Sequence, residues 1–125
     1  PRLRQGQWIL CDRFTDATYA YQGGGRQMDT GCIAWLENTV QGDLRPDITL
    51  LLDAPVEIGM QRAQKRGELD RFESERQDFF ERVRNSYLQQ AQANPQRYRI
   101  IDASRPLLEV QAQISEILDN LLKQV

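Results

Sequence analysis

The chain has 125 residues, enough for one domain with one hydrophobic core. Its net charge of −2 argues against a broad electrostatic footprint for nucleic acid. Because it contains no histidine, the usual general base near neutral pH is missing, and any chemistry must use carboxylates, arginines, hydroxyls or backbone groups. No apolar run approaches the length of a membrane span and no signal peptide is recognisable, so we expect a cytoplasmic protein without a membrane partner.

The first predicted element is a short buried strand at Trp8–Cys11. This stretch is apolar and β-prone and ends at Asp12, which is typical of a strand in a parallel sheet. A helix is expected over about residues 15–22, and the three consecutive glycines at 23–25 are expected to stop it. A second helix is predicted over residues 29–41 because its apolar residues recur at helical spacing.

The second half of the chain continues the alternation of strands and helices. We predict a strand at 48–52, a helix from Pro55 to Gly67, a charged surface segment at 67–76, a helix at 77–93, a strand at 98–101 and a helix from Pro106. This order indicates one α/β domain over residues 1–125, with a parallel sheet covered by helices on both faces. An aspartate follows each predicted strand, and the carboxyl edge of such a sheet is where ligands bind: Asp12, Asp53 and Asp102.

The segment that follows the first predicted strand carries the most informative side chains. Asp12 is suited to Mg²⁺, directly or through water, and Arg13 offers a planar fork suited to a phosphate. Thr18, Tyr21 and Gln22 would share one helical face, and the amide of Gln22 can donate and accept at the edge of a nucleobase. The residues alone also allow a structural Asp12–Arg13 ion pair and a core Tyr21.

This segment resembles the signature of bacterial thymidylate kinases. The match consists of Asp12-Arg13 after a strand, the hydroxyl residue Thr18, then Ala20-Tyr21-Gln22 and a Gly-Gly-Gly-Arg run. Residues 42–47, 66–73 and 101–104 resemble three further family segments in the right order, so the resemblance covers essentially the whole chain. It implies a P-loop nucleoside-monophosphate-kinase-like fold, a homodimer, and transfer of the γ-phosphoryl of ATP to dTMP. The Ala-Tyr-Gln sequence argues against a related kinase with another acceptor.

The resemblance also implies a role for each residue of the signature. Arg13 would clamp the phosphate of dTMP, and Asp12 would support, through water, the Mg²⁺ that bridges the ATP phosphates. Thr18 and Gln22 would contact the thymine base. Tyr21 would pack near the deoxyribose and help to exclude a 2′-hydroxyl. Each of these assignments is an expectation carried over from the family.

Residues 67–76 resemble the family's lid. Phosphoryl transfer needs positive charge around the transferring group, and Arg62, Arg66 and Arg71 would supply it as catalytic residues when the lid closes. The alternative is a solvated charge run in which neighbouring carboxylates neutralise these arginines. Ser104 and Arg105 lie where the resemblance places the adenine side of the ATP site.

The 125 residues contain no phosphate-binding loop. Such a loop ends in Gly-Lys-Ser/Thr, whereas Lys65 and Lys123 are the two lysines here and neither follows a glycine. The fold is therefore expected to be incomplete, without the family's first two strands. One of these lies, in the family, between the strands that end at Asp12 and Asp53. Three arrangements follow: the missing part lies outside this sequence, the strands re-pair between protomers, or the chain is a truncated, non-catalytic fragment that self-associates through exposed sheet edges.

Overall fold

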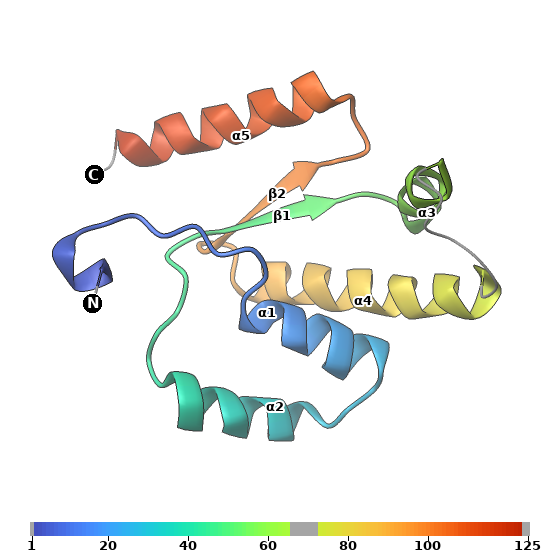
Figure 1. Cartoon of the computed structure of the whole chain (residues 1–125), viewed down its shortest axis with the longest axis horizontal. Helices are drawn as coiled ribbons and strands as arrows, with labels where there is room; N and C mark the ends of the chain where they lie inside the picture. Colours follow the sequence, from blue (N-terminus) through green and yellow to red (C-terminus); the bar gives the residue numbers. More distant parts are fainter. Residues whose placement is uncertain (1, 66–72, 124–125) are drawn as a thin grey trace.

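The computed structural model describes residues 2–65 and 73–123 (Figure 1). In chain order its elements are η1 (Leu3–Gln5), α1 (Thr15–Thr18), η2 (Tyr19–Gly25), α2 (Thr30–Leu36), η3 (Glu37–Gln41), β1 (Thr49–Asp53), α3 (Val56–Lys65), α4 (Glu73–Ala93), β2 (Tyr98–Asp102) and α5 (Leu107–Leu122). The element η1 is a 3₁₀ turn, and η2 and η3 are π-helical segments that continue α1 and α2.

The two strands form a parallel pair. The register aligns Thr49 with Tyr98 at one end and Asp53 with Asp102 at the other. Both strands are short runs rich in Leu and Ile, which is the composition of strands covered by helices. The pairing places two of the three predicted strand-end aspartates side by side at the carboxyl edge of the sheet, as the sequence predicted.

Helices lie on both sides of this pair. In Figure 1, α5 covers one side of the strands, while α4 and α1 lie on the other side and α2 lies beyond α1. The buried apolar side chains come from both the helices and the strands: Ala20, Ile33, Val56, Val83, Ala91, Tyr98 and Ile101. The parallel strands with helices on both faces confirm the predicted α/β class.

The glycine run does not stop the first helix, contrary to the prediction. The helix passes through Gly23, Gly24 and Gly25 as π-helix, and the Arg26 N–H donates to the Tyr21 carbonyl five residues earlier at 3.0 Å. The physical reason is close packing on α4. A Cβ atom at Gly24 would lie 2.6 Å from Ser86 Cβ, and one at Gly25 would lie 2.5 Å from Phe79 Cε2.

The predicted strand at Trp8–Cys11 is also wrong. The segment is extended but unpaired: within residues 2–65 and 73–123, no backbone hydrogen bond joins it to another strand. Its side chains lie in solvent, with Leu10 97% and Trp8 67% exposed. A strand needs a neighbour to satisfy its backbone groups, and β1 lies across a cavity from this segment.

The remaining elements follow the sequence closely. The strand at 49–53 and the helices before and after it match the predicted order, and α4 begins at Glu73, four residues before the predicted start. The structure therefore describes only the last part of the predicted charged segment at 67–76. Residues 66–72 lie outside the described part of the chain, and residues 73–76 belong to α4.

Candidate functional site

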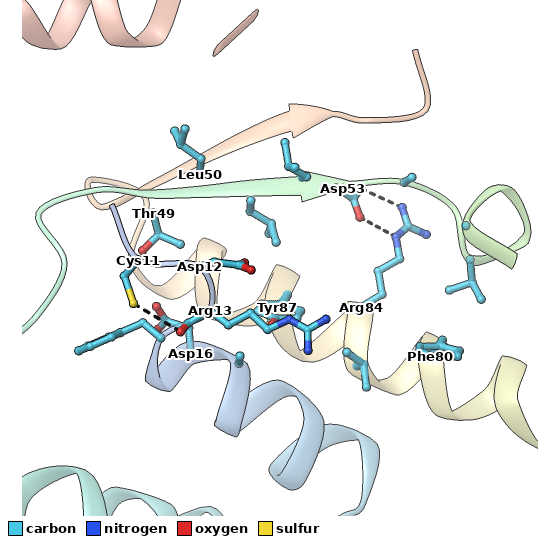
Figure 2. A pocket seen from close by; sticks show the side chains of 18 of the residues that line it. Cys11, Asp12, Arg13, Asp16, Thr49, Leu50, Asp53, Phe80, Arg84 and Tyr87 are labelled. Carbon is cyan, nitrogen blue, oxygen red and sulfur yellow. Dashed lines mark hydrogen bonds and ion pairs between the residues drawn. The ribbon is translucent and has the colours of Figure 1, made fainter. Parts of the chain in front are cut away.

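A cavity of about 970 Å³ lies between the extended segment 9–13, β1 and α4 (Figure 2). Its walls combine apolar side chains of β1 with charged side chains from all three segments. The charged residues and the tyrosine that line it are Asp12, Arg13, Asp16, Asp53, Arg76, Arg84 and Tyr87. The cavity therefore brings the predicted Asp12 and Arg13 together with the carboxyl end of β1.

Arg13 lies at the turn between the extended segment and α1. Its φ of 60° is in the left-handed region, which is uncommon for a residue with a side chain. Its guanidinium carbon lies 5.2 Å from the centroid of the Tyr21 ring, the geometry of a cation–π contact. This conformation keeps the exposed guanidinium beside the aromatic ring while its donors remain available to an anion.

Tyr21 belongs to an aromatic wall behind Arg13. Its ring centroid lies 6.2 Å from that of Phe79 and 6.4 Å from that of Tyr87, both of which are on α4. Burial, followed by the charge of Tyr21, raises the pKa of Tyr87 to about 12. The three rings offer an aromatic surface beside the Arg13 cation.

The other two predicted acceptor residues lie on the same helical segment. Thr18 ends α1 and is exposed, whereas Tyr21 and Gln22 are half-buried in η2. The change from α-helix to π-helix between Thr18 and Tyr21 alters the angular relation that ordinary helical spacing predicts. The assignment of Thr18, Tyr21 and Gln22 to a nucleobase and its sugar stays a prediction.

The sequence reasoning missed an ion pair at the carboxyl end of β1. The Arg84 guanidinium donates from Nε to Asp53 Oδ1 at 2.7 Å and from Nη2 to Asp53 Oδ2 at 3.0 Å (Figure 2). The hydrogen bond to Asp53 is the main reason that the pKa of Arg84 is raised. Asp53 was recognisable as a strand-end residue, but no signal in the sequence identified its partner thirty-one positions later.

A second bidentate pair holds Asp16, which also lines the cavity. Arg97 donates from both terminal nitrogens to the Asp16 carboxylate at 2.8 Å each. This pair joins α1 to the residue that precedes β2. Two of the carboxylates around the cavity, Asp16 and Asp53, are therefore each occupied by an arginine fork.

The loop after β2 is organised around Asp102. Asp102 Oδ1 accepts from the Ser104 backbone N–H at 3.0 Å and from the Ser104 hydroxyl, and Oδ2 accepts from Arg105 Nε at 3.1 Å. These donors, Ser104 first, lower the pKa of the Asp102 carboxyl. Arg62 reaches the same loop from α3 and donates to the carbonyls of Ala103 at 2.6 Å and Ser104 at 3.1 Å.

Three of the predicted site residues lie together at the loop after β2. Ser104 and Arg105 hold Asp102, and Arg62 is bound to the carbonyls of the loop. Arg66 and Arg71 lie outside the described residues. The catalytic role predicted for the three arginines stays a prediction.

Asp12 is exposed and lines the cavity on the side opposite β1. Within residues 2–65 and 73–123, no group of three or more metal-ligating side chains comes together. A single carboxylate is compatible with Mg²⁺, which protein sites bind through one or two carboxylates together with water and substrate phosphates. In the same described ranges, no helix is long and apolar enough to cross a membrane.

Paired parallel strands, covering helices and an arginine-bearing cavity along β1 are consistent with an incomplete α/β fold of the nucleoside-monophosphate-kinase class. Residues 1–114 match the family model for thymidylate kinase. The chain belongs to the thymidylate kinase family.

Curated relatives support this assignment over almost the whole chain. The thymidylate kinase of Pseudomonas savastanoi pv. phaseolicola is 59% identical over 123 residues, and that of Pseudomonas putida strain F1 is 58% identical over 124 residues. These alignments cover 98% and 99% of the chain but 59% of each relative. The chain therefore spans about three fifths of the length of these relatives.

A solved structure agrees with the fold. The crystal structure of thymidylate kinase from Ehrlichia chaffeensis superposes with a TM-score of 0.68 at 28% sequence identity. The match covers 96% of this chain and 53% of that structure. The described fold is thus about half of a thymidylate kinase.

Proposed function

We propose that this chain carries the acceptor site and lid of a thymidylate kinase, which transfers the γ-phosphoryl of ATP to dTMP and releases dTDP and ADP. The observation that carries the proposal is the placement of Arg13 at the cavity, 5.2 Å from the Tyr21 ring. A planar cation beside an aromatic surface suits a ligand that combines a phosphate with a nucleoside.

The proposed acceptor site needs no general base, because the attacking phosphate oxygen of dTMP is already ionised. Arg13 binds this phosphate with its fork, and Tyr21 packs near the deoxyribose against the Phe79–Tyr87 wall. Thr18 and Gln22 bind the thymine base. Positioning and charge stabilisation then account for the rate.

The donor side is proposed from Asp12, which lines the cavity, and from the loop that follows β2. Asp12 would hold Mg²⁺ through water, and the bound ion would supply positive charge next to the ATP phosphates. Ser104 and Arg105 lie beside the adenine in a loop that Asp102 and Arg62 keep in place. Arg62, Arg66 and Arg71 stabilise the transferring phosphoryl group.

The proposed activity also requires a phosphate-binding loop, which these 125 residues do not contain. The cavity separates segment 9–13 from β1 and is bordered by apolar side chains of both, among them Ile9, Leu10 and Leu50. This is the environment in which a buried parallel strand fits. We propose that the active enzyme combines this chain with a strand and loop supplied from outside the 125 residues, and that it acts as a homodimer.

The alternative is a chain that acts without catalysis and associates through the unpaired edge of β1. Its support is the exposure of apolar side chains such as Leu10, 97%, and Leu52, 57%. The kinase hypothesis and the non-catalytic hypothesis differ in whether the chain binds dTMP.

Calorimetric titration of the chain with dTMP, dAMP and thymidine tests the acceptor site, and the intact mass confirms which residues are present. We expect dTMP to bind at least tenfold more tightly than thymidine, because Arg13 contacts the phosphate. Arg13→Met should abolish this difference, while Arg45→Met, a matched loss of an arginine paired with Glu37 away from the cavity, should retain it. Equal binding of dTMP and dAMP would contradict the proposal.

A chimera tests catalysis. The upstream part of the Pseudomonas savastanoi relative, joined to this chain where the alignment begins, would supply the phosphate-binding loop. We expect the chimera to form ADP from ATP only when dTMP is present, and the 125-residue chain to form none. A chimera that binds dTMP but forms no dTDP would favour the non-catalytic reading.

A further inference from the structure

Some charged side chains around the cavity form ion pairs, and Arg13 does not. Asp16 and Asp53 both line the cavity, and each is bound by both oxygens to an arginine. Arg13, in contrast, contacts the face of an aromatic ring, which does not neutralise it. The two ion pairs therefore neutralise two carboxylates near Arg13, the residue that is proposed to bind the acceptor phosphate.

The Arg84–Asp53 pair also links three segments. Arg84 projects from α4, the helix that carries the Phe79–Tyr87 wall, and Asp53 ends β1. The Asp53 carbonyl accepts from the Ala103 backbone N–H at 2.8 Å, in the loop on the proposed donor side. The pair is half-buried, with 31% of the Arg84 side chain and 21% of the Asp53 side chain exposed.

We propose that Arg84 is a positioning residue of the acceptor-phosphate site, where its fork fixes Asp53 and neutralises the carboxylate that would otherwise repel the phosphate of dTMP. This inference rests on the proposed function, because it assumes that dTMP binds in this cavity. Arg84 acts through Asp53. Its loss leaves a fixed negative charge at the cavity wall, in surroundings where charges interact more strongly than in bulk water.

The test compares the affinities of a charged and an uncharged ligand for the same site. Arg84→Met keeps much of the length and apolar stem but removes the charge. We expect it to weaken dTMP binding about tenfold while thymidine binding changes less than about twofold, since only dTMP carries the phosphate. The loss should shrink as the salt concentration rises from about 0.05 to 0.5 M.

A double variant separates repulsion from loss of structure. Asp53→Asn in the Arg84→Met background removes the uncompensated charge, so dTMP affinity should return to within about threefold of the wild-type value. Arg84→Lys retains the charge but loses the bidentate geometry, so its dTMP affinity should lie between those of the wild type and Arg84→Met. If Arg84→Met does not fold, the double variant and Arg84→Lys test whether Arg84 neutralises Asp53. Arg45→Met is the matched control and should change neither affinity.

The outcomes separate this inference from the proposed function. If wild-type chain and chimera both fail to bind dTMP, the proposed function fails and this inference with it. If the wild type binds dTMP but Arg84→Met weakens dTMP and thymidine equally, or weakens neither, Arg84 has at most a structural role. Failure of the double variant to regain affinity would likewise overturn the charge-neutralising role.

Discussion

The two walls of the cavity differ in how firmly the chain itself holds them. One wall includes α4, and η2 packs so closely on this helix that Gly24 and Gly25 leave no room for a Cβ atom. On the other wall, segment 8–11 is extended, unpaired and exposed in the described structure. The helical contacts are completed by the packing of η2 on α4, whereas segment 8–11 has no paired strand among the described residues to satisfy its backbone groups.

This contrast also explains which candidate residues have defined surroundings. Tyr21 lies against the rings of Phe79 and Tyr87, and Asp53 and Asp16 are each bound by an arginine guanidinium. Asp12 belongs to the extended segment and is exposed. The candidate residues of the helical wall therefore have defined contacts, whereas the extended segment has no paired strand within residues 2–65 and 73–123.

The largest expected effect comes from disturbing the helical wall. Gly24→Ala places a Cβ 2.6 Å from Ser86 Cβ and 3.0 Å from the Arg82 carbonyl oxygen, so α4 must shift. We expect a loss of about 3 kcal/mol in the free energy of unfolding, measured by urea denaturation. Gly59→Ala is the matched control in α3, because no other part of the described chain lies within 4 Å of its Cβ position. This control should stabilise the chain by up to about 1 kcal/mol.

The next effect concerns the junction between α1 and β2. Arg97→Met removes both hydrogen bonds to Asp16, which join α1 to the start of β2. We expect a loss of about 2 kcal/mol in the free energy of unfolding, because the half-buried Asp16 carboxylate loses its charged partner. Addition of Asp16→Asn should recover part of the loss, and additive effects in this double-mutant cycle would contradict direct coupling.

A smaller effect is expected at the carboxyl end of β2, where pH reports on the loop. The donors Ser104 and Arg105 lower the pKa of Asp102 in the folded chain. Their stabilising contribution is therefore present above the unfolded pKa, about 3.9, and is lost as pH falls through the lower folded value. The stability difference between wild type and Asp102→Asn should shrink as pH falls from about 5 to 2. Ser104→Ala should reduce this pH dependence, and a difference that grows on acidification would contradict the assignment.

The smallest effect is expected on the extended wall. Leu10 is 97% exposed, so Leu10→Ser should change the free energy of unfolding of the 125-residue chain by less than about 0.5 kcal/mol. In the chimera the same substitution should cost about 2 kcal/mol, because the supplied strand would bury this side chain. Equal effects in both proteins would show that the cavity is not where that strand binds.

Sequence reasoning was most reliable where local chemistry decides the structure. The alternation of apolar runs with helical spacing predicted β1, β2 and the helices around them, and the polar residues after the runs marked the sheet edge. It failed at Trp8–Cys11, because a β-prone sequence cannot specify whether a partner strand is available. It also failed at the glycine run, where packing on α4 overrides the usual tendency of glycine to end a helix.

The site shows the same division. Arg13 and Tyr21 were recognisable from a short segment, and the structure brings them into contact. The ion pairs of Arg84 and Arg97 were not recognisable from the sequence, because each arginine pairs with an aspartate more than thirty positions away. The sequence around each arginine has the pattern of an ordinary helix or loop. Long-range ion pairs depend on the fold as a whole.

The one-sided pairing of β1 has a consequence for amide hydrogen exchange. The Thr49 N–H donates to the Arg97 carbonyl at 3.0 Å, and the Asp53 carbonyl accepts from Ala103, so the odd-numbered residues of β1 face β2. Because successive peptide groups of a strand point to opposite edges, the amides of Leu50 and Leu52 face the cavity. Exchange along β1 in deuterated water should therefore alternate, slow at Leu51 and fast at its two neighbours. A strand seated in the cavity would slow all three.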